Sequence, residues 1–149
     1  MPGGAIAVAS DHAGFDLKEI LKRDLQEAGH EVLDLGTNST ASVDYPDFGK
    51  AMGEAIASGK AARGVLVCGS GIGISIAANR NPKVRAVLAH DVTSARLSRE
   101  HNDANVIAFG QRVIGIETAR EALRAFIDTE WEGGRHASRV AKLSKGCLS

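Results

Sequence analysis

Two patterns of hydrophobic and polar positions alternate along the chain. Short apolar runs rich in β-branched residues predict five buried strands, at 6–9, 30–35, 65–67, 84–89 and 106–109. Apolar residues recur at helical spacing in 17–28, 45–58, 72–78, 92–100 and 116–127, and a last helical stretch contains Val140 and Leu143. Strands that alternate with helices form parallel sheets through right-handed crossovers. The pattern therefore predicts an α/β fold, a three-layer α/β/α sandwich around a five-stranded parallel sheet.

Composition narrows the class of protein. The chain has 149 residues, of which 44% are hydrophobic and 24% charged, so we expect a single domain, 1–149, with a substantial core. Lys+Arg and Asp+Glu both number 18, so no overall field favours nucleic acid or a membrane as partner. The apolar runs are too short for a membrane span, and the first residues lack the pattern of a secretory signal.

Cysteine usage points to the compartment. Two cysteines are too few for a disulfide framework, and no paired zinc-ligand spacing is present. We therefore expect a cytoplasmic protein with no metal site, and we assign no role to Cys147.

The stretch 64–80, GVLVCGSGIGISIAANR, is the strongest candidate for chemistry. A buried strand runs into Cys68, a glycine turn follows, and a helix begins. In an open α/β sheet, ligands bind where strand carboxyl ends face helix amino ends, and the exposed N–H groups there favour anions. The same helix end favours the thiolate form of a cysteine, which can act as a base or nucleophile. The residues alone also allow a bland alternative, in which Cys68 is a small apolar residue that ends a strand.

The glycine turn has alternatives of its own. Gly69, Gly71 and Gly73 let a ligand approach the backbone, or they simply make a tight turn without one. The dinucleotide fingerprint needs its third glycine where Ile74 stands, although Asp91 lies about the expected distance on for a ribose contact, so a nucleotide-binding module stays a weaker alternative. Ser70 could bind a substrate oxygen or make a local turn bond.

Further polar residues lie near strand ends. Asp11 and His12 follow the first strand, where they could orient a hydroxyl or phosphate or could cap the next helix. Histidine exchanges protons near neutral pH, so His101 suits proton transfer, although a histidine at a helix end is commonly solvated. His101 precedes its strand, which puts it at the opposite sheet edge from Cys68 unless a second subunit supplies it.

Three arginines could hold a phosphate dianion. Arg135 and Arg139 are four residues apart and share one face of a helix, and Arg112 follows the last strand. A solvated helix face is the alternative explanation.

Taken together, these motifs resemble the ribose-5-phosphate isomerase B family, which also contains galactose-6-phosphate isomerase subunits. The matching stretches span nearly the whole chain: SDHAGFDLK (10–18), DYPDFG (44–49), CGSGIGISIAANR (68–80), SREHNDANVIAFGQRV (98–113) and GGRHASRV (133–140). The resemblance implies a doubly wound, Rossmann-like domain that forms a homodimer, sometimes a tetramer, with active sites shared between subunits. It implies a cofactor-free aldose–ketose isomerase that interconverts ribose 5-phosphate and ribulose 5-phosphate through an enediolate. Allose 6-phosphate, galactose 6-phosphate and tetrose phosphates remain alternative substrates.

The resemblance also implies roles for individual residues. Cys68 resembles the base that moves the proton between C1 and C2, and Ser70 replaces a more usual threonine in the proton exchange between O1 and O2. His101 and Asp11 resemble the ring-opening pair. The enediolate would be stabilised by the backbone amides of Gly69, Gly71, Ile72 and Gly73. Some family members use a glutamate as base near Ile74, and its absence here favours the thiol.

The remaining matched positions are substrate contacts. The resemblance assigns them as follows: phosphate at His12, Arg112, Arg135 and Arg139, a substrate contact at Asn102, and a pocket position at Tyr45.

Overall fold

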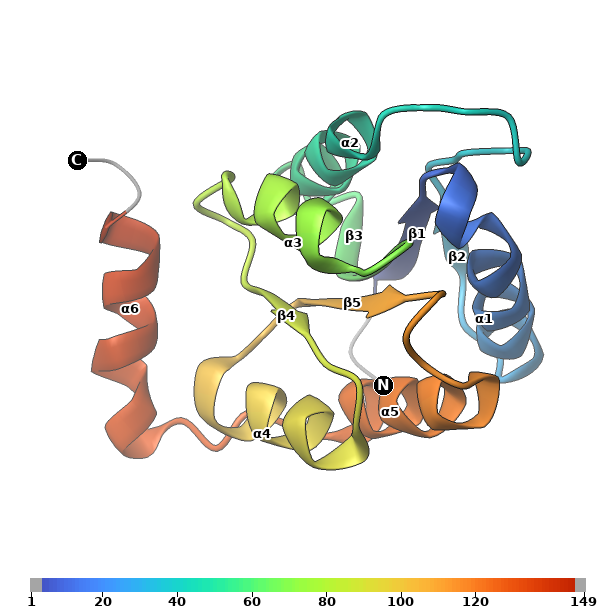
Figure 1. Ribbon diagram of the computed structural model, residues 1–149. Coiled ribbons are helices and arrows are strands. Elements are labelled where there is room, and N and C mark those ends of the chain that lie inside the picture. Colours follow the sequence, from blue (N-terminus) through green and yellow to red (C-terminus); the bar gives the residue numbers. More distant parts are fainter. Residues whose placement is uncertain (1–3, 147–149) are drawn as a thin grey trace.

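The chain folds around one parallel sheet. The computed structural model describes residues 4–146, so Cys147 lies outside the described residues. The strands are β1 (Ala5–Ser10), β2 (Val32–Asp34), β3 (Ala61–Cys68), β4 (Ala86–Leu88) and β5 (Val106–Gly110). All are parallel, in the order β2-β1-β3-β5-β4, which confirms the five-stranded sheet predicted from the sequence (Figure 1).

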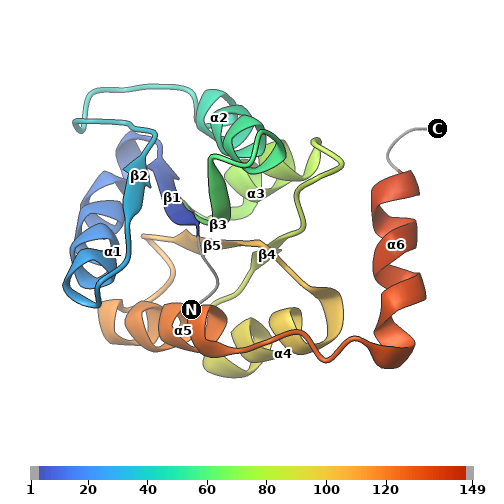
Figure 2. The same cartoon turned by 180° about the vertical axis from the view of Figure 1, so that it is seen from behind.

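Helices cover both faces of the sheet. They are η1 (His12–Gly14), α1 (Phe15–Glu27), α2 (Tyr45–Ala57), α3 (Ile72–Asn79), α4 (Val92–Asn102), α5 (Ile116–Asp128), η2 (Gly134–His136) and α6 (Ala137–Gly146). One hydrophobic core lies between the sheet and α1, α4 and α5, and a second lies between the sheet, α2 and α3 (Figures 1 and 2). The three-layer α/β/α sandwich is therefore confirmed.

The strands differ in length from their predictions. The edge strands β2 and β4 each have three residues, fewer than predicted, whereas central β3 has eight and begins earlier than predicted. A central strand bonds to neighbours on both sides and an edge strand on one side only, so apolar residues at an edge need not extend the ladder.

One predicted boundary was wrong. The helix predicted at 92–100 continues as α4 through Asn102 and ends at Asp103, whose φ of 48° is left-handed. Asp44 occupies the N-cap position of α2, yet its side chain makes no capping bond, and its main-chain carbonyl accepts from the Asp47 N–H instead.

Helix α6 stands apart from the layered body. Both views show it projecting beyond the sheet, on the same side as α4's end (Figures 1 and 2). A cavity of about 370 Å³ lies between it and the β4 edge, lined by Val87, Asn102 and Leu143 among others. None of the described helices is long and apolar enough to span a bilayer.

Candidate active site

The glycine turn brings a thiol to the start of a helix. Cys68 is the last residue of β3, and its Sγ accepts a hydrogen bond from the Gly71 N–H at 3.1 Å. The thiol side chain is nearly buried, with 4% of the residue exposed. Ser70 Oγ accepts from the Ile72 N–H at 3.2 Å, so this hydroxyl does make the local turn bond. This bond holds the sulfur at the amino end of α3.

Two glycines of the turn are required by their surroundings. Gly71 has φ of 79°, and an added Cβ there would lie 2.9 Å from the carbonyl oxygen of Phe109. A Cβ on Gly73 would lie 2.5 Å from the ring of Tyr45, so this tyrosine packs directly over the turn. Both positions need glycine for close approach, and Gly71 needs it for backbone conformation as well.

The exit of β5 is joined to the glycine turn through main-chain bonds. The N–H groups of Gln111 and Arg112 donate to the carbonyls of Cys68 and Gly69, at 2.9 and 3.0 Å. These bonds bring the Arg112 guanidinium beside the turn, 3.2 Å from where a Cβ on Gly69 would lie. A cation therefore lies beside the glycine turn within the same chain.

His90 supports this exit loop, although the sequence analysis assigned no function to it. Its Nε2 accepts from the Gly110 N–H at 3.0 Å, which fixes the backbone just before Arg112. The only sequence signal was its position directly after the predicted fourth strand.

Asp11 and His12 face the same sheet edge from the end of β1. Asp11 is 6% exposed, and its Oδ1 accepts from the Gly14 N–H at 3.1 Å, the capping role that the sequence left open. The Nδ1 of His12 accepts from the Val43 N–H at 3.1 Å. Because Nδ1 is the acceptor, the neutral ring carries its proton on Nε2, which can donate to an anion.

A buried lysine anchors the loop that contacts His12. The side chain of Lys18 is fully buried, and its Nζ donates to the carbonyl of Thr37 at 2.6 Å and to Asp34 at 2.9 Å. Burial raises the pKa of Asp34, but hydrogen bonds from Lys18, the Gly36 N–H and Lys22 outweigh it, so the pKa is lowered overall. This charge cluster holds the chain that leads toward Val43 and Tyr45. This charge cluster was not predicted from the sequence, because a lysine beside the apolar face of a helix is normally solvated.

We call Asp11, His12, Tyr45, 68–73 and Arg112 the glycine-turn region. They come from the ends of β1, β3 and β5, which are neighbours in the sheet, and from the start of α2. The structure thus brings these predicted residues to one sheet edge.

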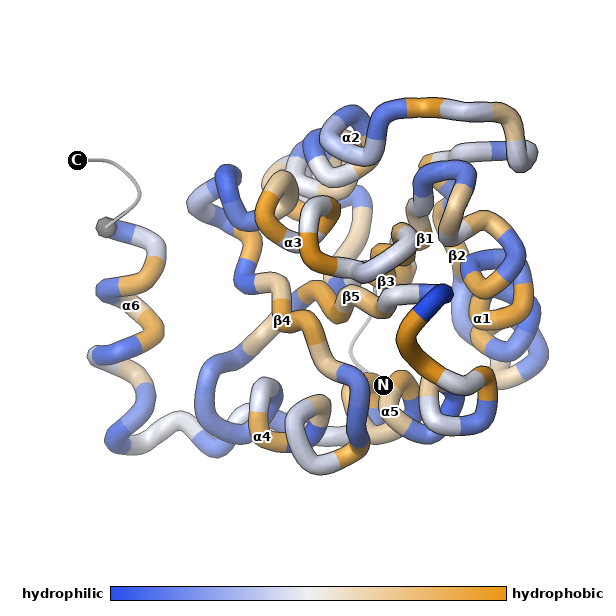
Figure 3. Tube along the Cα trace, viewed as in Figure 1, coloured by the Kyte–Doolittle hydropathy of each residue, from blue (hydrophilic) through white to orange (hydrophobic). Residues whose placement is uncertain are grey.

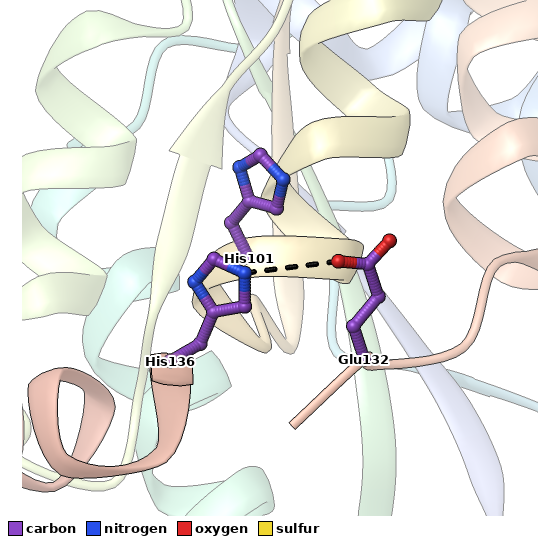
Figure 4. A group of neighbouring side chains, drawn as sticks. All are labelled: His101, Glu132 and His136. Carbon is purple, nitrogen blue, oxygen red and sulfur yellow. Dashed lines mark ion pairs between the residues drawn. The ribbon is translucent and has the colours of Figure 1, made fainter. Parts of the chain in front are cut away.

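The other predicted residues form a second group together with His136, and we call this group the histidine-pair region: His101, Asn102, Arg135, His136 and Arg139. The His101 and His136 rings stack, with centroids 4.5 Å apart and planes 18° apart (Figure 4). Burial lowers the pKa of His136, and so do the charges of Arg135, His101 and Arg139, which lie close enough to act on it. The sequence missed His136, although it follows Arg135 directly in a matched motif.

The two regions do not meet within one chain. Cys68 pairs with Gly110 at the end of β5, whereas His101 and Asn102 end the helix that precedes the start of that strand. The length of β5, roughly 13 Å at 3.3 Å per residue, separates the two edges. A larger cavity, of about 540 Å³, lies between α1 and α5 and contains none of the predicted site residues.

The structure argues against the alternative that the chain is a nucleotide-binding module. Asp91, the candidate ribose contact, caps α4: its Oδ1 accepts from the Ser94 N–H at 2.6 Å and its Oδ2 from the Ser94 hydroxyl at 2.9 Å. Both oxygens are therefore engaged in a structural role.

Comparisons with known proteins show the family to which the chain belongs. The family model described as Ribose/Galactose Isomerase matches residues 6–143. Ribose-5-phosphate isomerase B of Escherichia coli is 46% identical over 139 residues, covering 93% of each chain. D-erythrulose-4-phosphate isomerase of Pectobacterium atrosepticum is 43% identical over 140 residues, covering 93% of this chain and 92% of its own. The solved ribose-5-phosphate isomerase B of Clostridium thermocellum superposes with a TM-score of 0.93 at 47% identity, covering 95% of each chain.

A parallel α/β sheet covered by helices on both faces is typical of proteins that bind small ligands at the carboxyl ends of their strands. The chain belongs to the ribose/galactose isomerase family. It is therefore an enzyme of the aldose–ketose isomerase class that acts on sugar phosphates.

Proposed function

We propose that this enzyme interconverts D-ribose 5-phosphate and D-ribulose 5-phosphate, with Cys68 as the base. The observation that carries the proposal is the position of the Cys68 sulfur, at the amino end of α3, where it accepts the Gly71 N–H at 3.1 Å. The thiolate takes the proton from C2 of the open-chain aldose and returns it to C1. Ser70 exchanges the proton between O1 and O2, after its hydroxyl gives up the turn bond to Ile72.

The intermediate of this reaction is an enediolate, whose negative charge needs donors. The first N–H groups of a helix have no partner within the helix, and Ile72 and Gly73 begin α3. A preorganised oxyanion donor lowers a barrier by about 3–4 kcal/mol. The backbone of the glycine turn thus supplies charge stabilisation beside the base, and the proposed reaction needs no cofactor.

The furanose ring must open before the proton can move, and the phosphate must be held. We assign ring opening to His101 with Asp11, and the phosphate to His12, Arg112, Arg135 and Arg139. Asn102 contacts the sugar, and Tyr45 forms a pocket wall over the glycine turn. These residues belong to both regions, so this assignment requires a partner subunit.

We infer that the enzyme is a homodimer in which each site joins the glycine-turn region of one subunit to the histidine-pair region of the other. Ile72 and Ile76 on α3 are 52% and 59% exposed, beside the glycine turn. The cavity between α6 and the β4 edge is lined by Asn102 and by the apolar residues Val84, Val87 and Leu143 among others. Figure 3 shows hydrophobic positions along β4 and on α6. When α3 of one subunit packs into this cavity of the other, Cys68 is brought toward the partner's His101.

A second candidate substrate is a four-carbon aldose phosphate. It is favoured by the 43% identity with an enzyme named for D-erythrulose 4-phosphate. We expect the loop 37–43 and the pocket around Tyr45 to decide between the two substrates, because the glycine turn is common to both reactions. Galactose 6-phosphate and allose 6-phosphate remain further alternatives.

A substrate panel tests the proposal. The kcat/KM of the purified protein is measured for ribose 5-phosphate, erythrose 4-phosphate, allose 6-phosphate and galactose 6-phosphate. We expect ribose 5-phosphate to rank first. A higher kcat/KM for another sugar would replace the substrate, and no turnover of any of them would reject the proposal. A cytoplasmic location and a single functional domain stay predictions.

A further inference from the structure

A cluster of potential metal ligands lies in the histidine-pair region, where the sequence analysis expected none. One ligand atom each from His101, Glu132 and His136 lie within 4.8 Å of one another (Figure 4). The three residues come from the end of α4, the loop after α5, and η2. Segments distant in sequence thus bring two imidazoles and a carboxylate together.

The His136 nitrogen in this cluster has no hydrogen-bond partner. His136 is 7% exposed, and its buried Nε2 makes no hydrogen bond among the described residues. The Glu132 Oε1 lies 3.7 Å from this nitrogen, which is beyond hydrogen-bond distance. A buried polar atom without a partner costs free energy, so an additional group that bonds to it is favourable.

The donor set suits a divalent transition-metal ion. Imidazole and carboxylate bind Zn²⁺ and similar ions, and three protein ligands leave a coordination position open. Ligand atoms bound to one zinc ion at about 2.0–2.2 Å lie roughly 3–3.5 Å apart, so the cluster must close by about 1 Å. Glu132 can move, because half of its side chain is exposed. His101 is only partly buried, and its ring must turn out of the stack to aim a nitrogen at the ion.

Positive charges around the cluster limit its affinity for a metal ion. Arg135 and Arg139 lie close enough to act on His136, and their charges oppose a bound cation. Glu132 supplies the one negative charge among the three ligands. We therefore expect binding weaker than that of a structural zinc site.

We propose that His101, Glu132 and His136 form a binding site for a divalent transition-metal ion of the Zn²⁺ class, whose occupation removes His101 from proton transfer. The binding site stands on the cluster alone, whereas the effect on turnover rests on the proposed function. Metal binding here would act as inhibition, because an imidazole nitrogen bound to an ion can no longer carry a proton.

Zinc titration by calorimetry tests the site without requiring activity. Both thiols are first removed by Cys68→Ala and Cys147→Ala in the full chain, because cysteines also bind zinc. We expect one ion per chain. Glu132→Gln should weaken binding by about 10- to 100-fold or more, the range seen when even an indirect partner of a ligand is lost. The matched control is Glu130→Gln, two residues away and exposed, which should leave binding unchanged.

Two results would overturn the site: no zinc bound by the thiol-free protein, or equal affinity in the Glu132→Gln and Glu130→Gln proteins. The effect on turnover is measured separately, in protein that keeps its cysteines. Zinc should inhibit it, and Glu132→Gln should raise the zinc concentration required while the zinc-free rate stays the same. If zinc binds through Glu132 but does not slow turnover, the claim about His101 is wrong. If the protein isomerises no sugar phosphate, the proposed function fails, and the calorimetry still decides the site.

Discussion

The glycine-turn region and the histidine-pair region are built in different ways. In the first, main-chain bonds fix the backbone: the carbonyls of Cys68 and Gly69 accept from the N–H groups of Gln111 and Arg112. In the second, a stack of two imidazoles joins the end of α4 to η2. The turn region is embedded in the sheet, whereas η2 leads into α6, which stands apart from the body (Figure 1).

The difference follows from the chemistry proposed for each region. A base must reach one carbon atom, and oxyanion donors must meet one oxygen, so small displacements there cost much of the rate. A backbone that is fixed by the ends of the strands can place the base and the oxyanion donors accurately. Arginine and histidine side chains act on a phosphate or a ring oxygen over a longer reach and tolerate a less rigid support. A dimer with twofold symmetry joins one region of each kind at each of two sites.

The largest expected effect is at the sulfur of the glycine-turn region. Cys68→Ala should lower kcat for ribose 5-phosphate by on the order of 10²–10⁴, the usual contribution of a general base. KM should change little, because the thiol acts on the reacting proton rather than on the phosphate. Steady-state kinetics with circular dichroism as a check of folding measures both. Cys147→Ala is the matched control and should keep full activity; near-wild-type turnover of Cys68→Ala would reject the thiol as base.

A smaller and more selective effect is expected at His101. D-ribose 5-phosphate closes to a furanose through O4, whereas D-erythrose 4-phosphate cannot, because its O4 carries the phosphate. His101→Ala should therefore lower kcat/KM for ribose 5-phosphate by about 10²-fold or more, as for loss of an acid–base group, and much less for erythrose 4-phosphate. The comparison uses kcat/KM of wild type and variant with both substrates.

Equal losses for the two sugars would mean that His101 acts in the proton transfer itself. Arg135→Ala serves as the control for phosphate binding, since both sugars carry that group. It should raise KM for both by similar factors.

Mixing the two inactive proteins tests the partnership between the regions. In a mixed dimer of Cys68→Ala and His101→Ala chains, one site carries both changes and the other carries neither. Random exchange at equal amounts makes about half of the dimers mixed, so about a quarter of wild-type activity should return. Activity that stays at the level of the separate variants, with exchange verified by mass spectrometry, would place each complete site in one chain.

The sequence predicted the order of strands and helices better than it predicted where each of them begins and ends. Alternation of apolar runs and helical segments predicted all five strands, because helices cover both faces of the sheet and its strands are therefore mostly apolar. It predicted the short edge strands poorly, since the ladder there depends on a single neighbour that local sequence does not specify. The overrun of α4 through His101 has the same origin: Asp103 ends the helix in a left-handed conformation that its side-chain type only weakly signals.

Contiguity decides which site residues could be found from the sequence. The thiol, the glycines and the helix start lie within 64–80, so their proximity is guaranteed by the chain. Lys18 and His90 were missed because their partners, Asp34 and Gly110, are 16 and 20 residues away and meet them only through the sheet. The spacing of four between Glu132 and His136 was a local signal of their contact, but His101 joins them only in the fold.

The smallest expected effect concerns what anchors the glycine-turn region. Asp34 has a lowered pKa, so its interaction with Lys18 stabilises the fold above the ordinary aspartate pKa near 3.8, and this contribution is lost below that value, as the pH falls through the lowered pKa of the folded state. The free energy of unfolding, measured with urea, should therefore be lower for Asp34→Asn than for wild type at pH 7. This difference between the two proteins should become smaller toward pH 3. Asp44→Asn, at an exposed position without a capping bond, should show no such narrowing.

The same variant separates the two regions. Since Lys18 holds the loop that leads to His12 and Tyr45, Asp34→Asn should raise KM for ribose 5-phosphate modestly while zinc affinity at the histidine pair stays unchanged. A gap in stability that is equal at pH 7 and pH 3 would mean that Asp34 stabilises the fold through its shape and hydrogen bonds rather than its charge. A change in zinc affinity would mean that the two regions are coupled through the body of the fold, which their positions at opposite sheet edges argue against.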